Sequence, residues 1–201
     1  MGTIFYVMGK SASGKDTIYN ELIKKSSLGL ETVRLYTTRP IRAEEKNGET
    51  YNFVNEADFE SFLNQGKIIE HRVYNTVHGK WVYFTLDDGQ INIADKKKVY
   101  LMIGTLESYK DTAKYFGNEN LIPLYIEVEM GERLQRAVNR EKQQKSPKYK
   151  ELCRRFLADE EDFSEEKIKN CKIVKRYQNE NIDVCIAEIE KDVRNCINNM
   201  I

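Results

Sequence analysis

The residues best suited to chemistry lie near the start of the chain, in a glycine-rich stretch that follows a short apolar run. Gly9, Gly14 and Lys15 have the spacing G-x-x-x-x-G-K. Glycines let the backbone curl until several N–H groups converge on phosphate oxygens, and a following helix N-terminus adds partial positive charge. Lys15 would then reach the outer phosphates of a bound nucleotide. The predicted phosphate-binding residues are Gly9, Ser11, Ser13, Gly14, Lys15, Asp16 and Thr17.

The residue after the lysine departs from the usual pattern. A Ser or Thr hydroxyl normally helps to hold Mg²⁺ at this position, but here Asp16 stands there, followed by Thr17. A carboxylate is a harder and stronger oxygen ligand for Mg²⁺ than a hydroxyl, although it brings negative charge close to phosphates. Either Asp16 takes over magnesium binding or the site has lost its chemistry.

Arginines form a second set of candidate residues. Arg39 and Arg42 are three apart on a predicted loop, where two planar guanidinium forks can converge on one phosphate. Arg136 and Arg140 are four apart in a predicted helix and therefore share one face, and Arg155 lies in the next helix. On spacing alone, a solvated surface is the favoured explanation for both groups of arginines.

The elements that must position these residues alternate between strand and helix, with the phosphate loop after the first strand. This order predicts an α/β fold: a mostly parallel sheet with helices on both faces and ligands at the C-terminal ends of the strands. Two of the predicted strands form a hairpin that turns at His78-Gly79. The strands are expected at 3–8, 31–38, 51–54, 67–77, 81–85, 98–103, 121–128 and 171–175. The helices are expected at 17–25, 56–64, 105–116, 131–143, 148–169 and 181–198, with a short one opened by 87–89.

Length and composition narrow the class of protein. The 201 residues suit one domain, and 32 basic residues balance 32 acidic ones, so no nucleic-acid or membrane-surface partner is expected. The sequence has no long apolar stretch and begins with a strand rather than a signal peptide, so a cytoplasmic location is expected. The four cysteines form no C-x-x-C pair, which favours reduced thiols over a zinc site. The oligomeric state is left open.

A longer motif resembles one known family. The segment Thr37-Thr38-Arg39-Pro40-x-Arg42-x-x-Glu45-x-x-Gly48-x-x-Tyr51-x-Phe53 resembles the guanylate kinase pattern T-T-R-x-P-R-x-G-E-x-x-G-x-x-Y-x-F, with Glu44 replacing a glycine. The similarity continues through Phe59 to Gly66-x-x-Ile69-Glu70-His71. Together with the phosphate loop it covers the first 71 residues in consistent register.

This resemblance implies an organisation and an activity. The chain would be one domain, 1–201, with a P-loop kinase core (1–35, 86–130 and 165–201), a small β-rich acceptor-binding subdomain (about 36–85) and a helical lid (about 131–164). The activity would be transfer of the γ-phosphoryl group of ATP to GMP, giving GDP and ADP, with Mg²⁺ as cofactor.

The resemblance also implies roles for individual residues. Arg39, Arg42 and Tyr51 would grip the phosphate of GMP. Glu70 would accept hydrogen bonds from guanine N1–H and the 2-amino group, which fits a carboxylate facing two donors.

Two further acceptor-site residues depend on the alignment of the following segment, which is longer than in the family. The family places a Tyr and a Ser or Thr there. Tyr83 and Thr85 are the favoured counterparts, and His78 and Lys80 are the rival pair.

The lid arginines match the family's clamp on the transferring group. Arg136, Arg140 and Arg155 resemble arginines that neutralise charge on the phosphoryl group, and with Lys15 they would form the catalytic set. Phosphoryl transfer relies mainly on positioning and charge neutralisation, so such a cluster is suitable machinery.

Three departures from the family leave alternatives open. Asp16 replaces the magnesium-binding hydroxyl, the strand ending at Gly104 lacks an acidic D-x-D-like pair, and Leu35 stands where a guanine-reading serine is expected. We hypothesise that Asp16 supplies the carboxylate missing from that strand. The alternatives to a GMP kinase are a kinase of the same fold for another phosphorylated acceptor and a non-catalytic nucleotide-binding module.

Overall fold

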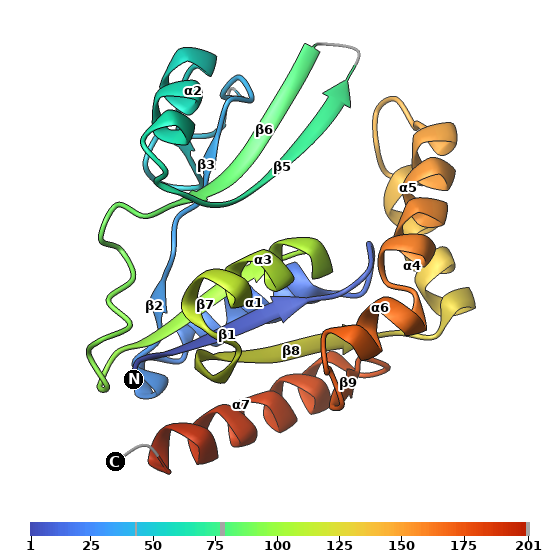
Figure 1. Cartoon of the computed structure of the whole chain (residues 1–201). Helices are drawn as coiled ribbons and strands as arrows, with labels where there is room; N and C mark the ends of the chain where they lie inside the picture. Colours follow the sequence, from blue (N-terminus) through green and yellow to red (C-terminus); the bar gives the residue numbers. More distant parts are fainter. Residues whose placement is uncertain (43, 77–78, 200–201) are drawn as a thin grey trace.

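The structure is a computed structural model that describes residues 1–42, 44–76 and 79–199 (Figure 1). Its larger sheet has five strands in the order β2-β7-β1-β8-β9, and every neighbouring pair is parallel. These strands are β1 (Thr3–Met8), β2 (Glu31–Thr32), β7 (Val99–Gly104), β8 (Leu121–Glu127) and β9 (Arg176–Gln178). The predicted α/β fold with a parallel sheet is confirmed.

The central strand β1 is buried on both faces, which explains its continuous apolar sequence. Ile4, Tyr6 and Met8 belong to one hydrophobic core, whereas Phe5 and Val7 belong to a second core on the opposite face. Successive strand side chains point to opposite faces, so the phosphate loop follows a strand that is fixed from both sides.

Helices cover both faces of this sheet, as predicted (Figure 1). The face of Phe5 and Val7 is covered by α1 (Lys15–Lys24) and α7 (Ile182–Asn198); the other is covered by α3 (Leu106–Phe116) and α6 (Glu165–Asn170). Short 3-10 helices lie at Ser26–Leu28 and Asn118–Asn120. Within the described ranges, no helix combines the length and the apolar character needed to cross a membrane.

A second, mixed sheet of four strands lies apart from the first, in the order β4-β3-β6-β5 (Figure 1). Its elements are β3 (Tyr36–Thr37), β4 (Asn52–Phe53), β5 (Ile68–Thr76) and β6 (Gly79–Leu86), with the helix α2 (Glu56–Asn64). Val82 and Phe84 pack with Phe59 of α2 on one face. The predicted hairpin is confirmed by antiparallel pairing of β5 with β6. Of the predicted turn at His78-Gly79, His78 lies outside the described residues, whereas Gly79 begins β6.

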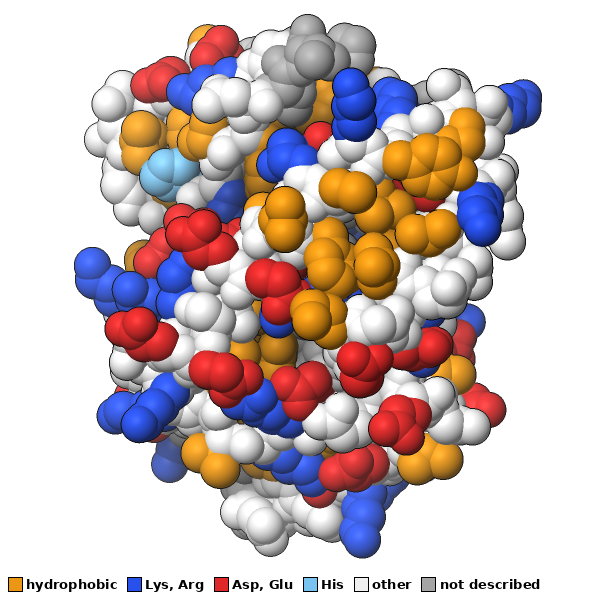
Figure 2. All heavy atoms as spheres, turned by 90° about the vertical axis from the view of Figure 1, so that its right-hand side faces the viewer, with side chains coloured by type: hydrophobic (Ala, Val, Ile, Leu, Met, Phe, Trp, Pro, Cys, Tyr) orange, Lys and Arg blue, Asp and Glu red, His pale blue; other side chains and the backbone are white. Residues whose placement is uncertain are grey.

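Two further helices, α4 (Met130–Lys142) and α5 (Tyr149–Asp162), contact each other beyond the end of β8 (Figure 1). Figure 2 faces this side of the molecule and shows hydrophobic side chains gathered on it. The exposed large apolar residues of the two helices are Met130, Leu134, Tyr149 and Leu157. The buried residues of α4 include Arg133 and Glu141, so polar contacts share in holding this pair in place.

Two predicted elements are divided in the structure. The segment 31–38, predicted as one strand, is split between β2 in the large sheet and β3 in the small sheet. The predicted helix 148–169 ends at Asp162 and resumes at Glu165, because buried Phe163 turns into the core before Ser164 starts α6.

Two other predictions were wrong. The last strand is β9 at 176–178 rather than 171–175, where Lys172 has a positive φ of 55° that is incompatible with a strand. The described residues from 87 to 98 form turns rather than a helix. Asp88 and Asp95 accept hydrogen bonds from nearby backbone N–H groups there, a local pattern that competes with helix formation.

Candidate functional site

The phosphate loop joins β1 to α1 at the C-terminal edge of the parallel sheet. Gly14 has φ 85°, and a Cβ there would lie 2.4 Å from Nδ2 of Asn179. A Cβ on Gly9 would lie 2.5 Å from the carbonyl oxygen of Ile126. Both positions therefore require glycine, one for its conformation and both for space.

Asn179, the residue after β9, holds the phosphate loop in place through a hydrogen bond. Its Nδ2 donates to the Ser13 carbonyl oxygen at 2.8 Å. Ser13 Oγ and Asn179 Oδ1 are the buried side-chain atoms, among described residues, without a hydrogen-bond partner. A hydroxyl without a partner at a phosphate loop is a donor that an anionic ligand can satisfy.

Lys15 and Asp16 begin α1, directly after the loop. Lys15 Nζ lies 3.3 Å from Asp16 Oδ2, and the Asp16 side chain is 78% exposed. The Asp16 carboxylate is therefore open to a ligand from solvent. It is also close enough to Tyr51 to contribute, after burial and Tyr83, to the raised pKa of Tyr51.

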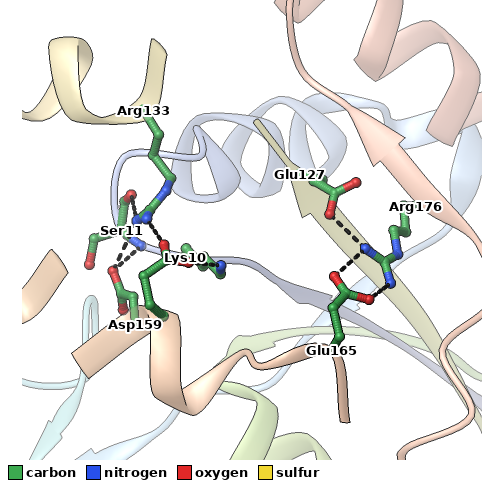
Figure 3. Close-up of polar contacts among 8 residues, drawn as sticks. Lys10, Ser11, Glu127, Arg133, Asp159, Glu165 and Arg176 are labelled. Carbon is green, nitrogen blue, oxygen red and sulfur yellow. Dashed lines mark hydrogen bonds and ion pairs between the residues drawn. The ribbon is translucent and has the colours of Figure 1, made fainter. Parts of the chain in front are cut away.

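A polar network, absent from the sequence predictions, ties the loop to α4 and α5 (Figure 3). The Ser11 N–H donates to Asp159 Oδ2 at 2.7 Å, and Lys10 Nζ donates to Glu160 Oε2 at 2.7 Å. Arg133, whose side chain is 1% exposed, donates to the Ser11 carbonyl oxygen at 3.2 Å and pairs with both carboxylates. Its guanidinium also lies 4.0 Å from the ring centroid of Phe156.

The position of Arg133 gave one signal that could have revealed this network. Arg133, Ala137 and Glu141 recur at intervals of four and form the buried side of α4. A charged residue in such a stripe needs partners, because an unpaired buried charge is strongly unfavourable. No pattern in the sequence indicated directly that the partners are Asp159 and Glu160.

A second ion cluster stabilises the same edge of the sheet (Figure 3). Arg176 in β9 donates to Glu165 of α6 and to Glu127 of β8, both at 2.9 Å through Nη1. The hydrogen bonds that Arg176 donates to these carboxylates raise its pKa, with Glu165 contributing most. The cluster joins two strands to the helix that follows α5.

The predicted lid arginines lie at different distances from the loop. Arg136 is half-buried, donating to Glu132 at 2.8 Å and to the carbonyl oxygen of Asn179 at 2.9 Å. Arg140 and Arg155 are exposed, and Arg155 lies 3.8 Å from Glu151 of its own helix. The structure thus places Arg136 beside the loop and leaves the other two facing solvent.

In the small sheet, Arg39 is 3% exposed and is held by several groups. Its two amino groups donate to the two carboxylate oxygens of Glu45 at 2.9 and 2.7 Å, and its Nε donates to the Tyr83 hydroxyl at 3.0 Å. This pairing raises the pKa of Arg39 and lowers that of Glu45 to about 2. Tyr51 and Phe53 flank the guanidinium, with ring centroids 5.8 and 5.3 Å away.

Arg42 lies on the exposed loop beside this cluster. Its backbone N–H donates to Glu45 Oε2 at 2.9 Å, whereas its side chain is exposed. The same carboxylate therefore orients Arg39 and the backbone of Arg42.

Glu70 lies on the same face of the small sheet as Tyr83 and Thr85. Glu70 is paired with Thr85 in the ladder, and the Thr85 hydroxyl donates to Glu70 Oε1 at 2.6 Å. Of the two alignments considered, this register puts Tyr83 and Thr85 beside Arg39 and Glu70. Lys80 is exposed near the hairpin turn, and His78 lies outside the described residues.

Leu35 and the strand β7 complete the positions singled out by sequence. Leu35 is half-buried against the core that contains Tyr6 and Tyr109. In β7, Tyr100 and Met102 belong to that core, so this strand contributes packing rather than acidic ligands.

Comparisons with known proteins agree with this architecture. The family model described as guanylate kinase matches residues 2–176. The chain belongs to the guanylate kinase family. A guanylate kinase of Malacoplasma penetrans is 30% identical over 186 residues, covering 89% of this chain and 82% of the relative. One from Chromohalobacter salexigens is 36% identical over 93 residues, 44% of this chain and 43% of that protein.

The fold matches as well. The crystal structure of guanylate kinase from Anaplasma phagocytophilum superposes with a TM-score of 0.64 at 20% identity, covering 96% of this chain and 85% of that one. In this guanylate kinase family member, the phosphate loop and the polar face of the small sheet are the two halves of the candidate site.

Proposed function

We propose that this chain transfers the γ-phosphoryl group of ATP to GMP, giving ADP and GDP. The observation that carries the proposal is that the chain belongs to the guanylate kinase family and presents two polar surfaces, the phosphate loop after β1 and the face of the small sheet that carries Glu70, Tyr83 and Thr85. The two surfaces are close enough that Asp16, in the first turn of α1, contributes to the raised pKa of Tyr51 and Glu70 to that of Tyr6 in β1, although burial is the main cause of both shifts. A donor nucleotide at one side would therefore face an acceptor at the other.

The donor half would bind the phosphates of ATP. The loop amides and Lys15 would hold them, and the unpartnered Ser13 hydroxyl would add a donor. Arg136 donates to the carbonyl oxygen of Asn179, whose side chain in turn donates to the loop at Ser13. Arg140 and Arg155 would come into contact with the nucleotide when the lid helices close, a motion common in kinases.

The acceptor half would bind GMP at two points. Arg39, Arg42 and Tyr51 would hold its phosphate, while Glu70, with its hydroxyl partner Thr85, would accept from N1–H and the 2-amino group. Tyr83 would position Arg39 through the 3.0 Å hydrogen bond. The acceptor phosphate is already an anion, so no general base is required, and alignment with charge neutralisation accounts for the rate.

The residues present fit Mg²⁺ in the form in which nucleotide kinases bind it. The described residues contain no group of three or more acidic, His or Cys side chains that could hold a metal alone. Mg²⁺ typically takes one or two carboxylates together with substrate phosphates and water, and the exposed Asp16 carboxylate can supply one of them. When bound, the ion would neutralise phosphate charge.

The test is ADP release with Mg-ATP and each of GMP, dGMP, AMP, CMP and UMP. Turnover confined to the guanine nucleotides supports the proposal. Turnover with a nucleotide of another base would support the role of the phosphate loop in binding ATP and would overturn the assignment of guanine to the acceptor residues. ATP binding without turnover on any acceptor would overturn the proposal in favour of a non-catalytic nucleotide-binding module.

A further inference from the structure

Glu70 has a second partner in addition to Thr85. Arg72, two residues further along β5, donates through Nε to Glu70 Oε2 at 3.1 Å and through Nη2 to Oε1 at 3.4 Å. The two side chains are 10% and 1% exposed, respectively. A buried ion pair is expensive to desolvate and stabilises little by itself, so its presence in a ligand site calls for a functional explanation.

The strand geometry directs Arg72 into the acceptor site. Residues two apart on a strand point to the same face, so Arg72 shares the face of Glu70. Arg72 is paired with Tyr83, and Glu70 with Thr85, across the hairpin. Arg72 therefore lies among the residues assigned to the acceptor. None of its hydrogen bonds to Glu70 uses Nη1.

The pair offers a particular order of hydrogen-bonding groups. A carboxylate has about four acceptor positions on its two oxygens, and in Glu70 Arg72 takes two of them and Thr85 one. The two guanine donors would therefore replace at least one hydrogen bond from Arg72, whose guanidinium would stay beside the carboxylate. The neighbouring guanidinium adds donors that Glu70 leaves unused. The resulting order is acceptor, acceptor, donor. The Watson–Crick edge of guanine presents the complement: the 2-amino donor, the N1–H donor and the O6 acceptor.

We propose that Arg72 is a specificity-determining residue of the acceptor site, donating to guanine O6 while Glu70 accepts from N1–H and the 2-amino group. This inference rests on the proposed function, which places guanine at Glu70. Adenine would present an amino group to Arg72 and the N1 acceptor to Glu70, so both contacts would be mismatched. Arginine contacts to guanine O6 are a common means of base discrimination in proteins.

The structure also suggests a simpler role, in which Arg72 blocks Glu70 and must leave before guanine binds. The two roles predict opposite changes in GMP affinity when Arg72 is replaced. Removing a residue that reads O6 weakens GMP binding, whereas removing a plug strengthens it. The two roles also predict different binding preferences between GMP and an analogue that is altered at O6 alone.

The experiment is calorimetric titration of GMP, 6-thio-GMP and AMP into wild type, Arg72→Met and Arg72→Lys, without ATP, at pH 7. Sulfur accepts hydrogen bonds weakly, so 6-thio-GMP removes the contact assigned to Arg72 and keeps both donors. We expect GMP to bind Arg72→Met about 10- to 100-fold more weakly than wild type. The wild-type preference for GMP over 6-thio-GMP should fall to nearly one in that variant. Arg194→Met, on the distant helix α7, is the matched control and should bind as wild type does.

Two results would overturn the inference: GMP binding in Arg72→Met that equals or exceeds the wild-type affinity, or an unchanged preference over 6-thio-GMP. Thermal melts report whether Arg72→Met folds. If it does not, Arg72→Lys decides the matter, because it keeps the charge beside Glu70 but loses the planar fork. A preference unchanged in that variant would contradict the role of Arg72.

The titrations separate this inference from the proposed function. Wild type that binds GMP with O6 discrimination but shows no turnover would overturn the function and keep the role of Arg72. If wild type phosphorylates GMP and the preference for GMP over 6-thio-GMP survives in Arg72→Met, the proposed function stands and the role of Arg72 is overturned. Failure of wild type to bind GMP would overturn both.

Discussion

The carboxylate of Asp159 in α5 accepts a hydrogen bond from the backbone N–H of Ser11, in the phosphate loop, at 2.7 Å. The two residues are 148 positions apart. Arg133 of α4 contacts both of them, through the Ser11 carbonyl oxygen and the same Asp159 oxygen. The helices that carry the predicted lid arginines are thus joined directly to the loop that would hold ATP. The positions of α4 and α5 and the conformation of the loop are therefore coupled through this contact.

Removing the charge of Asp159 should strengthen ATP binding. Asp159→Asn keeps an oxygen that can accept from Ser11 and removes a negative charge beside the predicted phosphate site. We expect the Kd of ATP to fall about fivefold at low ionic strength, and less at high salt, because the effect is electrostatic. Titration calorimetry at two salt concentrations measures it. Asp162→Asn, an exposed carboxylate of the same helix, should have little effect, and weaker ATP binding in Asp159→Asn would contradict the charge argument.

Asp16 should determine the magnesium dependence of turnover. If its carboxylate replaces the usual hydroxyl and the missing strand acid, Asp16→Ser should abolish Mg²⁺-dependent activity. Asp16→Asn, which keeps the size and loses the charge, should require more Mg²⁺ for half-maximal rate. Initial rates across a Mg²⁺ series test both variants. Full activity of Asp16→Ser at ordinary Mg²⁺ would refute the role of the carboxylate.

Replacing Arg133 by methionine should destabilise the protein, because Asp159 and Glu160 would lose their shared partner. The carboxylates are 18% and 35% exposed, which moderates the loss, so we expect about 2–3 kcal/mol. That corresponds to a fall in Tm of about 5–10 °C. The matched control is Arg154→Met, whose partner is also a carboxylate but whose side chain is 64% exposed. Its Tm should change by less than about 2 °C, and equal shifts in both variants would contradict the importance of burial.

The Arg39–Glu45 pair should make stability depend on pH in the acid range. Arg39 lowers the folded-state pKa of Glu45 to about 2 from an ordinary value of 4.5. The folded protein binds this proton less readily than the unfolded chain, so the contribution is complete above the ordinary pKa and is lost as the pH falls toward 2. Urea midpoints of wild type and Glu45→Gln should differ most above pH 5 and converge on acidification. Glu44→Gln, at an exposed neighbouring position, should show no such convergence.

Several features could be predicted from sequence because nearby residues encode them. The apolar run of β1, the positive φ of Gly14 and the cap that Asn55 gives to α2 depend on residues only a few positions away. Prediction from the local sequence failed where one segment contributes strands to two different sheets. Residues 31–38 look like one strand, but they serve two sheets, and no local pattern marks the division.

The sequence by itself determined the α/β class, the phosphate loop and the guanylate kinase motif, since backbone conformation and periodicity are local properties. Only the tertiary structure decided which side chains meet. The β5–β6 register put Thr85 on Glu70, and the packing of α4 on α5 put Arg133 between Asp159 and Glu160. Such contacts join residues 15 to 27 positions apart. They depend on strand register and helix packing, which the whole chain sets when its cores form.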